Sequence, residues 1–389
     1  MRYQLECSKL EFFRPDAFGF INKLKTQPSK YPMINLSIGA PNRPTPAWII
    51  EAMKTHLDNP AYHTYPPQHG APELCEAVAY WYGKRFGVEI DPKDNVLITV
   101  GIKEAIFNAL HSLVNAGDVV MVPDPGYPTY FEAVLFTGGK LLAYNSDAEA
   151  DEVLSEIEHK ARLHGPKIVI VNYPSNPTGR IVGLDFYKSL SEIASRYDFA
   201  VMSDLAYSEI AFDGLTVHSY LQARPGLELG FEYFAFSKTY NMAGWRVGAI
   251  VGDKRLVDAV KLYKSKIDSN VFYPIQQAAV TALKETPDSF YRELSGMYQQ
   301  RRDALVHGLS DIGLRFSPPQ GAMYTWVETP EGVDPWFFTE KLYKEYGILV
   351  VPGTAYGLNG SHRVRMGLVQ ETSLMEEAAR RLAEGGLLR

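Results

Sequence analysis

The sequence predicts an α/β protein with a large doubly wound, mostly parallel sheet domain and a smaller α+β domain. Short apolar runs alternate with helical patterns between about residues 95 and 255, which is typical of a parallel sheet with crossover helices. Several of these runs are apolar on both faces, as expected for strands covered by helices on each side. A long polar helical pattern, 289–309, then leads into a region of mixed strands and helices.

Six apolar runs predict the strands of the large sheet. Between the first two runs, apolar residues recur at helical spacing from Ala105 to Val114, which predicts a helix there. In the C-terminal region we expect a strand at 324–327 and helices at 335–346 and 373–383. The predicted strands of the large sheet are 96–100, 119–122, 168–171, 200–203, 233–236 and 247–251.

Composition limits the classes of function. The chain has 389 residues, 46% of them hydrophobic and 22% charged, and a net charge of −6. This balance is that of a globular protein and argues against a nucleic-acid or anionic-membrane partner. No apolar run approaches the roughly 20 residues that span a bilayer. Two cysteines fit no metal spacing and no disulfide framework, so we expect no metal site and a cytoplasmic location.

Polar residues follow several predicted strands at the point where each strand ends. Gly101 follows the first run, the loop 172–179 the third, Asp204 and Tyr207 the fourth, and Lys238 the fifth. In open parallel sheets, ligands bind beyond the carboxyl ends of the strands. We therefore expect these loops to meet at one edge of the sheet and to form a site.

The run FSKTYNMAGWRVG, 236–248, carries the most informative residue, Lys238. It places an amine in a turn between two buried strands, and Arg246 returns eight residues later. An amine that forms an imine and a guanidinium that binds an anion are what pyridoxal phosphate (PLP) requires. A solvated lysine in a turn is the competing interpretation.

Asp204 and Tyr207, in SDLAY, each allow two interpretations. Asp204 either caps a following helix or pairs with a protonated pyridine nitrogen and keeps the ring an electron sink. Tyr207 is either a packing residue or a hydrogen-bond donor to the ring oxygen of the same ligand.

Three further loops have the same two-sided character. NYPSNPTG, 172–179, is either a structural turn or a segment that aims Asn176 at the ligand, and we expect a cis Asn176–Pro177 bond. TVGIKEAI, 99–106, is a strand, a glycine and a helix start, and is either an ordinary strand-to-helix turn or a phosphate site. In PDPGYPTY, Tyr127 either stacks on a pyridine ring or lines the core.

HRVRMGL, near the C-terminus, contains two arginines on one face of an alternating strand, Arg363 and Arg365. Either arginine can hold a carboxylate through two hydrogen bonds or form a surface ion pair.

Nine segments occur in one order along the chain, and together they resemble the PLP-dependent aminotransferases of fold type I, class I/II. The resemblance covers nearly the whole length and is closest in appearance to the LL-diaminopimelate and alanine aminotransferase branches. The segments are LSIGAPNRPTP, YPPQHGAPEL, GIKEAI, PDPGYPTY, NYPSNPTG, SDLAYSE, SKTYNMAGWRVG, VPGTAYG and HRVRMGL.

The resemblance implies a role for each site residue. Lys238 forms the internal aldimine and moves a proton between the substrate α-carbon and the cofactor. Asp204 pairs with the pyridine nitrogen, Asn176 and Tyr207 hold the ring oxygen, and Tyr127 stacks on the ring. Five residues of one chain hold the phosphate with Tyr65 of a second subunit, so we expect a homodimer with shared sites. These five are Gly101, Ile102, Lys103, Ser237 and Arg246.

The substrate side and the domain division follow from the same resemblance. Arg365 holds the substrate α-carboxylate, assisted by Asn176 and the backbone of Gly39. Residues 1–46 with 286–389 form the small domain, which closes on the substrate. Residues 47–285 form the large PLP-binding domain.

The chain departs from the family pattern at several positions. A serine usually lies three residues before the lysine, where this chain has Ala235, and Ser or Ala often stands at Ile102. Two phosphate-binding hydroxyls are therefore absent, and we expect PLP to be held less tightly than is typical. Asn270 replaces a glycine, and in GAPN an acidic residue is more frequent where this chain has Ala40 or Asn42.

The predicted reaction moves an amino group from an L-amino acid to a 2-oxo acid, with 2-oxoglutarate as the expected acceptor, by a ping-pong mechanism. The alternative is a PLP-dependent C–S lyase or another elimination enzyme on the same scaffold. A transcriptional regulator with this domain is disfavoured because GAPN begins at residue 39, which leaves no room for a helix-turn-helix module. Neither GxxxxGK[ST] nor GxGxxG occurs.

Overall fold

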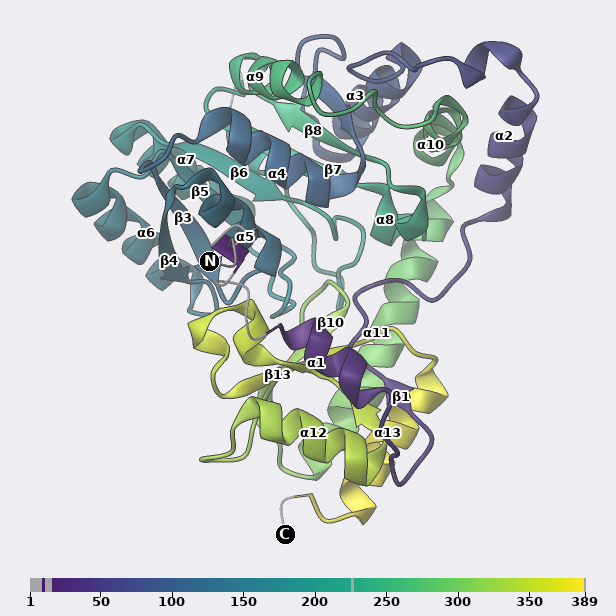
Figure 1. Ribbon diagram of the computed structural model, residues 1–389, viewed down its shortest axis with the longest axis vertical. Coiled ribbons are helices and arrows are strands. Elements are labelled where there is room, and N and C mark those ends of the chain that lie inside the picture. The colour runs from purple at the N-terminus through teal and green to yellow at the C-terminus, as the bar shows by residue number, and fades with distance from the viewer. Residues whose placement is uncertain (1–8, 11–15, 225–226, 388–389) are drawn as a thin grey trace, which may run out of the picture.

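The computed structural model describes residues 9–10, 16–224 and 227–387. A seven-stranded sheet with helices on both faces forms the upper part in Figure 1, and a four-stranded sheet with its own helices forms the lower part. Helix α11 (Asp288–Asp311) runs from the first part into the second. The predicted fold class is confirmed. The bounds of the two domains stay a prediction.

The large sheet is mostly parallel, as the sequence predicts. Its order is β2-β8-β7-β6-β5-β3-β4, and β8 alone is antiparallel to its neighbours. The strands are β2 (Val96–Thr99), β3 (Val119–Asp124), β4 (Lys140–Asn145), β5 (Ile168–Asn172), β6 (Ala200–Asp204), β7 (Gly230–Ala235) and β8 (Gly248–Gly252).

Residues of the central strands alternate between two apolar layers. Val169 and Val171 of β5 pack into one cluster with residues of α3, α7 and α10, whereas Ile168 and Ile170 pack into another with α4, α5 and α9. This is the period of two that a strand buried on both faces requires. The surrounding helices are α2 (Ala47–Leu57), η2 (Pro60–His63), α3 (Pro72–Phe86), α4 (Gly101–Leu113), α5 (Pro128–Thr137), α6 (Ala150–His164), α7 (Leu184–Tyr197), η3 (Tyr220–Ala223), α9 (Lys254–Lys264) and α10 (Tyr273–Glu285).

Two local predictions for the large sheet are wrong. The edge strand β4 is absent from the predicted set because its residues are only half-buried and its apolar run is short. The strand before Lys238 ends at Ala235, and Lys238 lies in the single-turn helix α8 (Phe236–Thr239) rather than in a turn. The 3₁₀ helix η4 (Ala243–Trp245) then leads to Arg246.

The second part combines the four-stranded sheet, in the order β12-β13-β10-β9, with a two-stranded parallel pair, β1 and β11. The predicted C-terminal strand and both predicted helices are present within one residue at each end. The elements are α1 (Ala17–Leu24), β1 (Ile34–Asn35), β9 (Phe316–Ser317), β10 (Tyr324–Glu328), α12 (Pro335–Tyr346), β11 (Ile348–Leu349), β12 (Val351–Pro352), η5 (Gly353–Tyr356), η6 (Leu358–Gly360), β13 (Arg363–Gly367) and α13 (Thr372–Glu384).

Candidate active site

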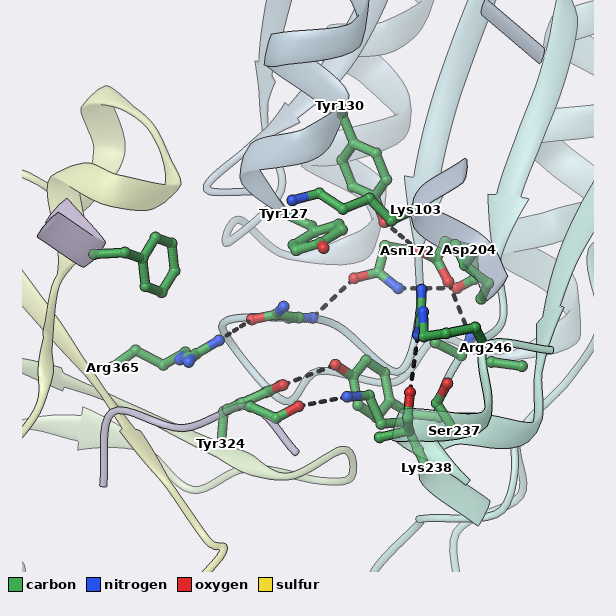
Figure 2. A pocket seen from close by; sticks show the side chains of 18 residues that line it. Lys103, Tyr127, Tyr130, Asn172, Asp204, Ser237, Lys238, Arg246, Tyr324 and Arg365 are labelled. Atoms are coloured by element: carbon green, nitrogen blue, oxygen red, sulfur yellow. Dashed lines mark hydrogen bonds between the residues drawn. The ribbon is translucent and has the colours of Figure 1, made fainter. Parts of the chain in front are cut away.

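A cavity of about 270 Å³ lies at the carboxyl edge of the seven-stranded sheet and is closed on its other side by residues of β10 and β13. Figure 2 shows side chains from both sheets turned toward it. Most of the residues predicted from the sequence line this one cavity: Gly39, Ile102, Lys103, Tyr127, Asn176, Asp204, Tyr207, Ser237, Lys238, Arg246 and Arg365.

Strand direction explains why these residues meet. The parallel strands β2, β5, β6 and β7 all end at this edge, where their following loops lie. Strand β8 runs in the opposite direction, so it begins at the same edge. Arg246, which precedes β8, is therefore brought beside Gly101, which follows β2. A Cβ on Gly101 would lie 2.5 Å from the Arg246 guanidinium.

Lys238 is the amine of the site. Its Nζ donates a hydrogen bond to the Gly39 carbonyl, which belongs to the segment that follows β1. Burial, together with the positive charges of Arg365 and Arg246, lowers the pKa of Lys238 to about 8, while Asp204 opposes the shift. A lysine with such a pKa has a much larger neutral fraction near neutral pH than an ordinary lysine, and the neutral amine is the form that acts as a nucleophile.

Asp204 ends β6 and is 4% exposed. Its Oδ2 accepts a hydrogen bond from Tyr130 Oη at 2.6 Å, and its Oδ1 accepts one from the Ala206 amide at 3.0 Å. Burial raises its pKa to about 6, against these hydrogen bonds. A turn rather than a helix follows it, so the helix-capping interpretation is wrong. Tyr130 is a site residue that the sequence analysis missed, although it lies three residues after Tyr127.

The loop 172–179 is fixed from within. The Asn176–Pro177 bond is cis, as predicted. The Asn172 Oδ1 accepts a hydrogen bond from the backbone amide of Asn176 at 2.9 Å. The Asn172 Nδ2 donates one to the backbone carbonyl of Asp204, also at 2.9 Å. Asn172 was not singled out in the sequence. Its buried amide ties the two loops that follow β5 and β6, which orients Asn176 toward the cavity.

The structure distinguishes the two arginines of β13. Arg365 lines the cavity and donates to Asn176 Oδ1 and to the Ser37 carbonyl, both at 3.0 Å. Its Nε is buried and has no hydrogen-bond partner among the residues that the structure describes. Arg363 instead pairs with Glu328 at 3.0 Å and lies 3.8 Å from Asp147.

Aromatic rings hold Arg365 in place. Its guanidinium lies 4.1 Å from the centre of the Tyr324 ring and 4.9 Å from that of Tyr356. The Tyr324 hydroxyl is 2.8 Å from the Tyr207 hydroxyl. A cation between aromatic faces is attracted by their quadrupoles, so the sheet that carries Arg365 presents it in one orientation. Neither Tyr324 nor Tyr356 was predicted as a site residue.

Of the other predicted residues, Tyr127 and Ser237 lie at the cavity and Tyr65 lies away from it. Tyr127 is half-buried against the cavity, and Ser237 lies in α8 beside Lys238. Tyr65 is 88% exposed and is not part of the lining of its own chain's cavity. Phe18 of α1 does line the cavity and had no sequence signal, because its segment has no motif.

The charges of the cavity fit a phosphorylated aldehyde cofactor. Lys103, Lys238, Arg246 and Arg365 contribute positive charge, whereas Asp204 is the lining carboxylate. No ion pair to a carboxylate engages any of these four cations in the part of the chain that the structure describes. The first turn of α4 lies beside the Arg246 guanidinium and offers amide donors to an anion, and the Lys238 amine and the Asp204 carboxylate line the same cavity. The fold and the cavity thus define a PLP-dependent enzyme of fold type I.

Comparison with known proteins identifies the family. The sequence profile described as "Aminotransferase class I and II" matches residues 31–382. LL-diaminopimelate aminotransferase 2 of Nostoc sp. is 36% identical over 390 residues, which cover 98% of each chain. An aminotransferase structure from Staphylococcus aureus is 31% identical, with a TM-score of 0.87 over 98% of this chain and 100% of that one.

A mutant of Thermus thermophilus aspartate aminotransferase has a TM-score of 0.89 at 27% identity, over 99% of this chain and 100% of that one. The chain belongs to the class I and II aminotransferases and is a PLP-dependent transaminase. The predicted resemblance is confirmed. Among the described residues, no helix is long and apolar enough to cross a membrane.

The depressed pKa of Lys238 predicts how cofactor-free protein takes up PLP. The neutral amine is the reactive form, so we expect the rate of uptake to rise with pH and to level off above about pH 8. The measurement is the rate at which visible absorbance appears after mixing at each pH. As a control, the rate at which an N-acetyl-lysine amide reacts with PLP should keep rising with pH up to about pH 10, near the ordinary pKa of a lysine side chain. A protein rate that follows the same course contradicts the prediction.

The absent hydroxyls predict loose retention of PLP. Ala235, the last residue of β7, and Ile102 both line the cavity. We expect wild-type protein to lose PLP during gel filtration and Ala235→Ser to retain it about tenfold more tightly, since a hydrogen bond to a charged group contributes about 1.5–3 kcal/mol. Ala206→Ser, which adds a hydroxyl beside Asp204, is the matched control. A full complement of PLP in filtered wild-type protein contradicts the prediction.

Proposed function

We propose that the cavity transfers an amino group from an L-amino acid to a 2-oxo acid, with Lys238 as the residue that bonds covalently to the aldehyde of PLP. One observation carries the proposal: an amine with a pKa of about 8 lies in one cavity with a buried carboxylate and with an arginine that has no carboxylate partner among the described residues. When bound, PLP supplies the electron sink that makes the α-proton of an amino acid removable.

The chain's own residues divide into three groups in this proposal. Asp204, ionised above pH about 6, holds the proton on the pyridine nitrogen, and the hydrogen bond from Tyr130 fixes the carboxylate. Asn176 and Tyr207 would donate to the ring oxygen, and Tyr127 would cover one face of the ring. These residues would hold the ring beside Lys238, whose Nζ would then remove and return the proton at the substrate α-carbon.

The second group binds the phosphate and the third binds the substrate. The amides of Gly101, Ile102 and Lys103, at the first turn of α4, form the phosphate seat with Ser237 and Arg246. Arg365 binds the substrate α-carboxylate with Asn176 and the Gly39 backbone, because its guanidinium is already oriented by two rings.

The acceptor in this proposal is 2-oxoglutarate. For the amino donor, whole-length relatives named LL-diaminopimelate aminotransferase at 36% identity support LL-diaminopimelate as the first compound to examine. The reaction is ping-pong, so each half can be measured alone.

Glutamate tests the proposed reaction directly. We expect PLP-loaded protein to lose its visible cofactor band and to yield pyridoxamine phosphate and 2-oxoglutarate. Lys238→Ala should lower this rate by roughly 10²–10⁴-fold, the usual contribution of a proton-transferring side chain. Pyruvate and ammonia released from a β-substituted amino acid without an acceptor, with glutamate inert, would instead establish a lyase.

We also propose a homodimer in which Tyr65 reaches the phosphate seat of the other subunit. Its 88% exposure and its absence from its own cavity support this role. Mixed dimers of Lys238→Ala and Tyr65→Ala chains test it. One of their two sites carries both substitutions, whereas the other is fully wild type. We expect each parent to be impaired and the mixture to regain activity. Activity no higher than the sum of the parents contradicts shared sites.

A further inference from the structure

The two sheets are joined beside the cavity by the carboxylate of Asp124, at the end of β3. Its Oδ2 accepts the Leu358 amide and its Oδ1 accepts the Asn359 amide, both at 3.0 Å. The Asn359 side chain donates back to the Asp124 carbonyl at 2.8 Å. Residues 358–359 belong to the segment between β12 and β13 of the four-stranded sheet. The contact therefore spans the two parts of the molecule.

The contact between Asp124 and residues 357–359, called the joint below, is tightly packed and nearly closed to water. Asp124 is 5% exposed, and a Cβ on Gly357 would collide with its carboxylate. Gly357 has φ +127, a region that only glycine adopts readily. The Gly126 amide adds a further bond to the Tyr356 carbonyl at 2.7 Å. A buried carboxylate requires such partners, because an unpaired one is costly.

Each side of the joint leads directly to a residue of the cavity. On one side, Tyr127 follows Gly126 in the chain and lines the cavity. On the other, Tyr356 precedes Gly357, and its buried ring lies 4.9 Å from the guanidinium of Arg365. The hydrogen bonds of Asp124 therefore help to set the distance between Tyr127, on one wall of the cavity, and Arg365, on the opposite wall.

We propose that Asp124 is a positioning residue for substrate binding: it holds the Tyr356–Arg365 side of the cavity against the Tyr127 side. Asp124 does not line the cavity, so it acts through Tyr356 and Arg365. The inference rests on the proposed function, in which Arg365 binds the substrate carboxylate.

Asp124→Asn tests the proposal with little change of shape. The two carboxylate oxygens each accept one amide, and an Asn side chain has one acceptor oxygen and an NH₂ group, so either Leu358 or Asn359 loses its acceptor. We expect KM for glutamate and for 2-oxoglutarate to rise about tenfold, because a looser joint leaves Arg365 less well placed for the substrate carboxylate. The kcat value and the absorbance of bound PLP should remain within about twofold of wild type, because Lys238 and Asp204 are untouched.

Asp253→Asn is the matched control. Asp253 is also 5% exposed and also accepts two backbone amides, Leu229 and Arg255, both at 2.8 Å. Both of its partners lie next to the seven-stranded sheet and far from the joint in the chain. We expect Asp253→Asn to lose stability while keeping wild-type KM values. Hydrogen exchange of the peptide that contains 356–360 should accelerate in Asp124→Asn and not in Asp253→Asn.

The outcomes separate this inference from the proposed function. An active wild type with unchanged KM in Asp124→Asn refutes the positioning role alone. A lower kcat with unchanged KM, or an equal rise of KM in both variants, also refutes it. A PLP-loaded wild type that fails to react with any amino donor refutes the proposed function, and the inference falls with it.

Discussion

The direction of the strands is the constraint on which the rest of the structure depends. Six parallel strands end at one edge of the sheet, and the antiparallel β8 begins there. This arrangement brings the amine of Lys238, the carboxylate of Asp204 and the guanidinium of Arg246 together, although 42 positions separate the second from the third (246 − 204). A fully parallel β8 would place Arg246 at the opposite edge, away from the first turn of α4.

The electrostatics of the cavity follow from that convergence. Burial and two neighbouring arginines disfavour the charged form of Lys238, and burial disfavours the charged form of Asp204. For Lys238 the native protein binds fewer protons than the unfolded chain between about pH 8 and 10.5, so this group contributes a stability that increases with pH across that window. Below about pH 8 the amine is charged in both states, and the full destabilisation caused by burying the charged Lys238 is present. An anion bound among these cations offsets that cost, which links folding of the site to its ligand.

Motifs made most of the site predictable from the sequence, because loops that follow parallel strands carry a recognisable pattern. Lys238, Asp204, Asn176 and Arg365 all line one cavity, although their assigned roles stay predictions. Residues that act by packing were missed. Tyr324 lies in an ordinary alternating strand, and its importance comes from the Arg365 guanidinium at 4.1 Å, a contact between strands that the sequence does not specify. The edge strand β4 was missed for a similar reason, since a half-buried strand gives a weak apolar signal.

Departures from the family pattern are accommodated by local chemistry. Asn270, at a position where glycine is usual, has φ +73, a conformation that asparagine tolerates better than most residues. Its side chain donates to the Gln68 and Ile98 carbonyls at 2.8 and 3.2 Å, which fixes the loop that glycine would leave free. Asn42, one of the two positions, with Ala40, at which we expect an acidic residue to be more frequent, accepts a hydrogen bond from the buried Arg301, and Glu371 pairs with the same guanidinium at 3.2 Å. Substitution by an uncharged residue is thus tolerated where a distant carboxylate reaches the same partner, whereas Ala235 introduces no polar group of its own.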